Sequence, residues 1–119
     1  MKFISTKIHG VLDYLVGIFL IVSPWIFRLN PTEAEGIVFI VLGIMAFIYS
    51  IFTNYELGLI RIIPVKIHLM LDILSGIVLA ASPWLFEFSD EVYIPHLVLG
   101  LFEITAGFMT QTKAWPQVR

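Results

Sequence analysis

Residues 7–27 read KIHGVLDYLVGIFLIVSPWIF, and residues 66–86 read KIHLMLDILSGIVLAASPWLF. At a constant offset of 59 residues, 13 of these 21 positions are identical. Similarity at a fixed spacing is the mark of an internal repeat. The segments that follow align more weakly at an offset of 57 residues, with Val41–Gly43 on Val98–Gly100 and Thr53 on Thr110. The chain is therefore predicted to be two tandem copies of a helical hairpin.

Each copy is predicted to cross a membrane twice. About 20 helical residues, at 1.5 Å each, span the roughly 30 Å of hydrocarbon in a bilayer. Four apolar stretches have this length, and one of them, residues 36–55, has no charged residue. We therefore expect an all-α membrane protein that forms a single transmembrane domain over residues 1–119. Its predicted parts are a first repeat, 7–55, with spans 8–27 and 36–55, and a second repeat, 66–112, with spans 67–86 and 93–112.

The composition supports a lipid environment. Hydrophobic residues make up 59% of the chain and charged residues 13%, against about 45–50% and 25% in soluble domains. Four helices of a soluble bundle would each need a charged outer face, and 7 basic and 9 acidic residues cannot supply them. The net charge of −2 gives no basic surface for nucleic acid. The absence of cysteine excludes disulfides, thiolate catalysis and zinc–thiolate sites.

Basic residues predict the orientation, because cytoplasmic loops are enriched in Lys and Arg. Six of the seven fall on one side of the predicted spans, namely Lys2, Lys7, Arg61, Lys66, Lys113 and Arg119. The opposite loops contain only Arg28, together with five acidic residues. Both termini are therefore expected in the cytoplasm. Two spans per repeat give both copies the same direction, so that a pseudo-twofold axis would run along the membrane normal.

Each repeat closes its first predicted span with a Ser-Pro-Trp triplet, Ser23-Pro24-Trp25 and Ser82-Pro83-Trp84. Proline frees the carbonyl one turn back, and the serine hydroxyl is suited to bond a nearby backbone group. The tryptophans are expected to anchor the helix ends at headgroup depth, with Trp115 at the other interface. A kinked, anchored helix end is the simpler reading of the triplet, and a ligand-gating hinge is the alternative.

Two such triplets 59 residues apart, each with an upstream His-x-x-x-Asp, resemble the SPW-repeat family of small prokaryotic membrane proteins. The resemblance covers nearly the whole chain and implies two transmembrane helices per repeat, with the motif in the first. It also implies that the protein lies in the cytoplasmic membrane of a prokaryote. A glycine often follows the tryptophan in the family, and neither copy has one before its loop, which bears on loop shape. The resemblance implies no activity.

His9 and Asp13 lie four residues apart on one helical face, and His68 and Asp72 repeat the pair. Because an aspartate facing lipid would cost about 2.5–3.5 kcal/mol at a helix centre, both pairs are expected to face the bundle interior. Three interpretations remain open. The pairs form a structural hydrogen-bonded lock between the first and third spans, or a metal or haem site, or a proton or ion relay.

Glu103 is the most unusual residue in the predicted spans, because it lies near the middle of the fourth one, where the first repeat has Ala46. It is expected to be a neutral, hydrogen-bonded packing residue, with partners among Ser75, Tyr14 and Tyr49. The alternative is a proton-carrying or substrate-contacting group. His96, near the end of the same span, is expected at the interface. Small residues on the second helix of each repeat are expected to pack in the core, or else to form a homodimer seam: Gly43, Ala46, Ser50, Gly100 and Gly107.

No catalytic motif is present, and the predicted loops are too short to form a pocket outside the bilayer. The sequence therefore favours a structural or interaction module that packs with itself or with a partner membrane protein. The alternative is an ion- or proton-handling, or metal- or haem-binding, bundle that uses the His-x-x-x-Asp pairs and Glu103. An enzyme is not expected.

Overall fold

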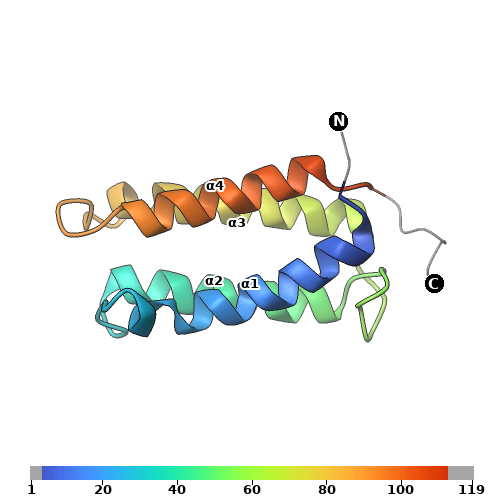
Figure 1. Ribbon diagram of the computed structural model, residues 1–119, viewed down its shortest axis with the longest axis horizontal. Coiled ribbons are helices and arrows are strands. Elements are labelled where there is room, and N and C mark those ends of the chain that lie inside the picture. Colours follow the sequence, from blue (N-terminus) through green and yellow to red (C-terminus); the bar gives the residue numbers. More distant parts are fainter. Residues whose placement is uncertain (1–3, 113–119) are drawn as a thin grey trace.

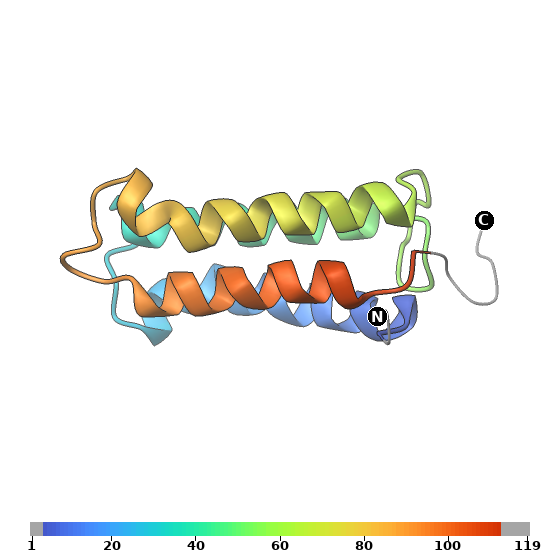
Figure 2. The same cartoon turned by 90° about the horizontal axis from the view of Figure 1, so that it is seen from above.

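The computed structural model describes residues 4–112, which form four α-helices. They are α1 (Thr6–Ile26), α2 (Ala34–Ile51), α3 (Val65–Leu85) and α4 (Ile94–Met109). The first pair and the last pair each pack closely as a hairpin, and the two hairpins lie side by side with α2 against α3 and α1 facing α4 (Figures 1 and 2). The all-α prediction is therefore confirmed, and each hairpin coincides with one sequence repeat.

Three of the helices, α1, α2 and α3, are long and apolar enough to cross a membrane. Helix α4 is also apolar, but its 16 residues extend only about 24 Å at 1.5 Å per residue. The second helix of each repeat ends earlier than predicted, at Ile51 and Met109. The reason is that the chain leaves the helix there to pair with a distant segment.

The pairing is the same in the two repeats. Thr53 forms a parallel bridge with Ile63, which precedes α3, and Thr110 forms one with Ile4, which precedes α1. The backbone N–H groups of Ile63 and Ile4 donate to the residues just before the threonines, at 2.7 and 3.0 Å. Each bridge therefore ties the end of one repeat to the start of the other.

The first helix of each repeat ends in the same way. Arg28 and Glu87, three residues after each tryptophan, have positive φ angles of 57° and 62°. The next N–H, from Leu29 or Phe88, donates five residues back to the carbonyl of the triplet proline, at 2.6 and 2.8 Å. This is the Schellman arrangement, in which glycine normally takes the left-handed position. The glycine that often follows the tryptophan in the SPW-repeat family, and that both copies lack, would fit at this left-handed position.

Glycines set the spacing within each hairpin. A Cβ added at Gly43 would lie 2.8 Å from the carbonyl of Gly17, and one at Gly76 would lie 2.7 Å from the carbonyl of Gly100. Such contacts are too short for any side chain, so the helix backbones touch. Ala46, Ser50 and Gly107 are buried as well. The small residues are therefore used for packing inside the chain, not for a homodimer seam.

An apolar core joins the repeats at the end of the bundle that holds the Ser-Pro-Trp triplets. Leu20 and its repeat equivalent Leu79 are both fully buried there. The ring of Phe39 stacks on that of its own equivalent, His96, with centroids 4.1 Å apart. His96, which is predicted to lie at the depth of the membrane interface, is fully buried within the bundle, and its Nε2 bonds the Glu35 carbonyl at 2.8 Å.

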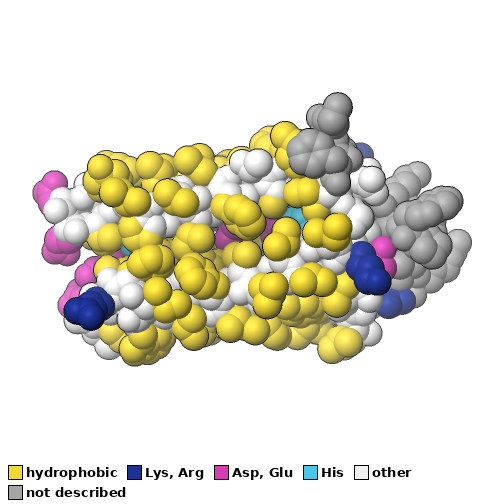
Figure 3. All heavy atoms as spheres, viewed as in Figure 1, with side chains coloured by type: hydrophobic (Ala, Val, Ile, Leu, Met, Phe, Trp, Pro, Cys, Tyr) yellow, Lys and Arg dark blue, Asp and Glu magenta, His cyan; other side chains and the backbone are white. Residues whose placement is uncertain are grey.

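The outer surface is apolar along the helices and charged at the two ends (Figure 3). Large hydrophobic side chains of all four helices are exposed, among them Trp25 and Trp84 at 61% and 53%. The loop 54–64 is a compact turn that buries Tyr55 and exposes Leu59 and Ile62. Among residues named in the sequence predictions, Lys2, Lys113, Trp115 and Arg119 lie outside the described residues.

Candidate functional site

The two His-x-x-x-Asp pairs meet in the interior between α1 and α3. His9 Nε2 lies 2.6 Å from Asp72 Oδ2 and 3.0 Å from Asp13 Oδ1. His68 Nε2 lies 2.8 Å from Asp13 Oδ2 and 3.2 Å from Asp72 Oδ2. Each imidazole therefore contacts the carboxylate of its own helix and that of the other repeat. We call these four side chains the His–Asp cluster.

The second nitrogen of each imidazole is held by a threonine of the other repeat. His9 Nδ1 lies 2.7 Å from Thr110 Oγ1, and His68 Nδ1 lies 2.7 Å from Thr53 Oγ1. Each threonine hydroxyl also donates its single hydrogen to a helix carbonyl four residues back, at 2.6 Å. The hydroxyl can then only accept from the imidazole, so Nδ1 carries a hydrogen in both histidines. Both Nε2 atoms are thereby directed at the carboxylates.

Two tyrosines complete the surroundings of the carboxylates. Tyr49 donates to Asp72 Oδ1 at 2.5 Å, and Tyr55 donates to Asp13 Oδ2 at 2.8 Å. These donors come from different positions of the repeat, the first from within α2 and the second from the loop after it. All four members of the cluster are at least nine-tenths buried as side chains. The cluster is thus hydrogen-bonded to the residues around it, and within it His9 Nε2 and Asp72 Oδ2 form a further hydrogen bond at 2.6 Å.

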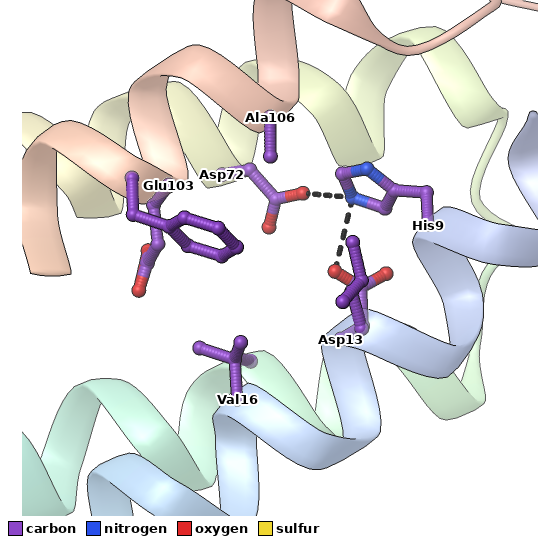
Figure 4. A pocket seen from close by; sticks show the side chains of 9 residues that line it. His9, Asp13, Val16, Asp72, Glu103 and Ala106 are labelled. Carbon is purple, nitrogen blue, oxygen red and sulfur yellow. Dashed lines mark hydrogen bonds and ion pairs between the residues drawn. The ribbon is translucent and has the colours of Figure 1, made fainter. Parts of the chain in front are cut away.

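A small cavity opens beside the cluster between α1 and α4 (Figure 4). It measures about 20 Å³, which is enough for one water molecule or one ion. Acidic and histidine side chains are visible through this face in the space-filling view (Figure 3). The lining includes His9, Asp13 and Asp72 from the cluster and, across the cavity, Glu103.

Glu103 is buried, yet neither of its carboxylate oxygens has a hydrogen-bond partner among the described residues. The expectation that a nearby hydroxyl would bind it is wrong. Tyr14 donates to the Leu57 carbonyl, Ser75 to the Leu71 carbonyl, and Tyr49 to Asp72. A buried carboxyl group without a partner is costly, which makes Glu103 the least satisfied polar side chain next to the cluster.

The seams between the two hairpins differ at this depth. In the α2–α3 seam, Tyr49 fills the space and its hydroxyl also lies 3.4 Å from Ser75. At the repeat-equivalent positions, the α1–α4 seam has Ala106 and Val16, which line the cavity. The cavity therefore exists where one repeat has lost an aromatic ring, and Glu103 stands where the other repeat has Ala46.

The Ser-Pro-Trp triplets lie at the far end of the bundle, away from the cluster. Ser82 donates to the Leu79 carbonyl, the group that Pro83 leaves free, at 2.7 Å. Ser23 donates instead to the Phe19 carbonyl, also at 2.7 Å. These contacts stabilise a helix end that contains proline, and they give the triplets no part in the cluster.

The cluster has a definite chemical requirement. With Nδ1 protonated, a neutral imidazole presents its Nε2 lone pair to the carboxylates, which is repulsive. Either a proton on each Nε2 or a shared cation removes that repulsion and balances the two negative charges. A haem does not fit, because both Nε2 atoms contact the same carboxylates and the adjoining cavity is far smaller than a porphyrin.

The threonines and Tyr55 are the site residues that sequence reasoning missed. The recurrence of Thr53 at Thr110 was visible, but a threonine after an apolar helix has many uses. Their role depends on bridges to residues that are distant in the chain. Tyr55 has no equivalent tyrosine in the second repeat, where Thr112 occupies its place, so the repeat offered no signal.

A family model of the SPW repeat domain matches residues 7–110, so the chain belongs to the SPW repeat family. The match spans all four helices and both His-x-x-x-Asp pairs. No match was found among curated proteins or among solved structures.

Proposed function

We propose that this SPW repeat protein is a four-span protein of the prokaryotic cytoplasmic membrane, with both termini in the cytoplasm. In this proposal it acts as a structural or interaction module that packs with itself or with another membrane protein. Its two repeats, 7–55 and 66–112, form a single transmembrane domain, related by a pseudo-twofold axis along the membrane normal.

Helix α4 is included as a span because of its position. It lies alongside α3 over the same length of the bundle as the three long apolar helices (Figures 1 and 2). A bilayer that surrounds those three helices must therefore surround α4 as well. Repeat-equivalent side chains meet at both ends of the bundle, as His9 with His68 and Phe39 with His96, which supports an axis along the helices.

The proposed orientation follows from the loops at the two ends. Lys7, Arg61 and Lys66 lie at the end of the bundle that holds the His–Asp cluster. Arg28 lies at the other end, among acidic residues of both loops. The basic end is expected in the cytoplasm.

One observation carries the structural interpretation, namely that the contacts of the cluster cross from repeat to repeat. His9 contacts Asp72 and Thr110, both in the second repeat, and His68 contacts Asp13 and Thr53, both in the first. The cluster therefore fastens the two hairpins to each other at a point where α1 and α4 otherwise pack loosely. A polar lock of this kind specifies how two similar hairpins pair.

The topology can be tested directly, because the chain contains no cysteine. Glu33→Cys should react with a membrane-impermeant maleimide added to intact cells, and Arg61→Cys should react only after the membrane is opened. The reverse pattern, or equal labelling of both variants from outside, would contradict the proposed orientation.

The role of the cluster can be tested with the double variant Asp13→Asn, Asp72→Asn. A structural lock predicts a lower unfolding midpoint or a changed oligomeric state in detergent, with no ion flux from either protein in vesicles. The matched control Glu33→Gln, Glu91→Gln removes two acidic groups from the opposite loops and should leave the midpoint unchanged.

The alternative, proton or ion handling, is favoured by the cavity that Glu103 shares with the cluster. It predicts proton flux into vesicles that contain the protein, and loss of that flux in Glu103→Gln. Flux that depends on Glu103 would replace the structural interpretation.

A further inference from the structure

We propose that the His–Asp cluster binds one divalent first-row transition-metal cation through its two imidazole Nε2 atoms and its two carboxylates. This inference rests on the geometry of the cluster and does not depend on the proposed structural role. The metal class follows from the donors, because imidazole and carboxylate without thiolate suit Mn²⁺, Fe²⁺, Co²⁺ and Zn²⁺.

The spacing of the donor atoms fits a shared ion. One ligand atom from each of the four side chains lies within 4.8 Å of all the others. The four N–O distances, which involve both carboxylate oxygens of Asp13 and Oδ2 of Asp72, range from 2.6 to 3.2 Å. Ligands about 2.1 Å from a metal and at right angles to each other lie about 3.0 Å apart. The donors therefore need little movement to coordinate one cation.

The unpaired nitrogen of His68 is a second, independent observation. His68 is fully buried, and its Nε2 has no aligned hydrogen bond to any described residue although two carboxylates lie within 3.2 Å. A buried ring nitrogen that lies this close to two carboxylates without an aligned hydrogen bond has the surroundings of a metal ligand.

The surroundings of the cluster match the outer shell of a metal site. Metal-binding histidines donate their other N–H to an oxygen acceptor, and ligating carboxylates are themselves hydrogen-bonded. Here Thr53 and Thr110 accept from Nδ1, while Tyr49 and Tyr55 donate to the carboxylates. Two neutral imidazoles, two carboxylates and one divalent cation also have zero net charge, which suits a buried site.

The cavity supplies room for a further ligand. Right-angle spacing leaves coordination positions free beyond the four protein donors, and a cavity of about 20 Å³ adjoins them, enough for one water molecule. Glu103 lines this cavity with both oxygens unpaired among the described residues. A metal-bound water in the cavity would give the Glu103 carboxylate the hydrogen-bond donor that it otherwise lacks.

The full chain, purified in detergent without a histidine tag, provides the test. Elemental analysis should find close to one equivalent of a first-row metal per chain. After the metal is removed with a chelator, added Co²⁺ should produce a visible absorption band that saturates at one equivalent and is displaced by Zn²⁺. A chelated protein that keeps its helical circular dichroism but binds neither ion would overturn the proposal.

Variants separate this site from chance binding at the surface. His68→Gln should lower Co²⁺ affinity by at least about 100-fold, whereas His96→Gln, which changes a buried histidine at the other end of the bundle, should leave it unchanged. Thr53→Val should lower affinity by about 10- to 100-fold, and Thr53→Ser, which keeps the hydroxyl, should restore it. If His68→Gln does not fold, the threonine pair decides the matter. Equal affinity in Thr53→Val and the parent would refute the site.

Discussion

The two seams that join the hairpins are equivalent in the sequence repeat but differ in structure. The α2–α3 seam is closed by Tyr49, which bonds Asp72 and lies beside Ser75. The α1–α4 seam has Ala106 and Val16 at the equivalent positions and contains the cavity. The shared part of the repeat therefore builds the scaffold and the His–Asp cluster, and a few differences at one depth give the cluster an open side.

The difference also indicates that the α2–α3 seam contributes stability, whereas the α1–α4 seam is available for function. Tyr49 is buried and makes the hydrogen bonds that a core residue should make. Glu103 is buried without a partner among the described residues, which costs stability. Unsatisfied polar groups that persist beside a cavity are typical of functional sites, where local stability is given up for binding or chemistry.

The largest effect is expected when the α2–α3 seam, which Tyr49 closes, is made to resemble the α1–α4 seam, which contains the cavity. We call these the closed seam and the open seam. Tyr49→Ala removes a buried aromatic ring between α2 and α3 and also the donor to Asp72. We expect it to lower the free energy of unfolding by about 3 kcal/mol, measured by denaturant titration in mixed micelles. Tyr93→Ala at the exposed start of α4 is the control, with a change near zero. A loss below about 1 kcal/mol would mean that the two seams are energetically alike.

A smaller effect separates the hydroxyl group of Tyr49 from its ring. Tyr49→Phe keeps the packing in the α2–α3 seam and removes only the hydrogen bond to Asp72. Because hydrogen bonds between membrane helices contribute about 0.6 kcal/mol on average and up to about 1.7, we expect a loss of about 1 kcal/mol by the same titration. A loss equal to that of Tyr49→Ala would show that the hydroxyl, not the ring, closes the seam.

The sequence predicted most of the scaffold because its signals are local or repeated. Apolar length located the helices, and the repeat located the hairpins and brought the His-x-x-x-Asp pairs to one interior face. The helix ends after Ile51 and Met109 were not predictable, since they depend on bridges between Thr53 and Ile63 and between Thr110 and Ile4. Such bridges join residues through the folded chain and leave no periodic pattern in the sequence.

Two buried polar residues show why the site was harder to predict than the fold. A histidine near the end of a span reads as interfacial, but His96 meets its own repeat equivalent, Phe39, inside the bundle. Glu103 was expected to find a hydroxyl, but the hydroxyls nearby bond to other groups. Depth in the membrane can be estimated from sequence position. Hydrogen-bond partners cannot, because they depend on the rotation of each helix.

The open seam should become more stable when its unsatisfied group is removed. Glu103→Met keeps the approximate length of the side chain and replaces a buried carboxyl group that has no partner among the described residues. In the metal-free protein we expect the unfolding free energy to rise by about 1 kcal/mol, with Glu103→Gln giving a smaller gain. The matched change Ala46→Met, at the repeat-equivalent position on the wall of the same cavity, should destabilise through overpacking, because about 20 Å³ cannot hold the longer side chain. Destabilisation by Glu103→Met would indicate that the carboxyl group is satisfied, for instance by a water in the cavity.

The smallest effects are expected where the two repeats are most alike, at the ends of α1 and α3. Arg28 and Glu87 both occupy the left-handed position that favours glycine. Replacing either by glycine removes backbone strain of about 1 kcal/mol and adds flexibility to the unfolded chain, so a net gain of about 0.5 kcal/mol is expected for each. Because the backbone hydrogen bonds that close the two helix ends are the same and share no partner, Arg28→Gly and Glu87→Gly should give equal gains that add in the double variant. Unequal gains would show that the two repeats also differ energetically at the ends of α1 and α3. Equal gains would confine the difference between the repeats to the depth of Tyr49 and Glu103.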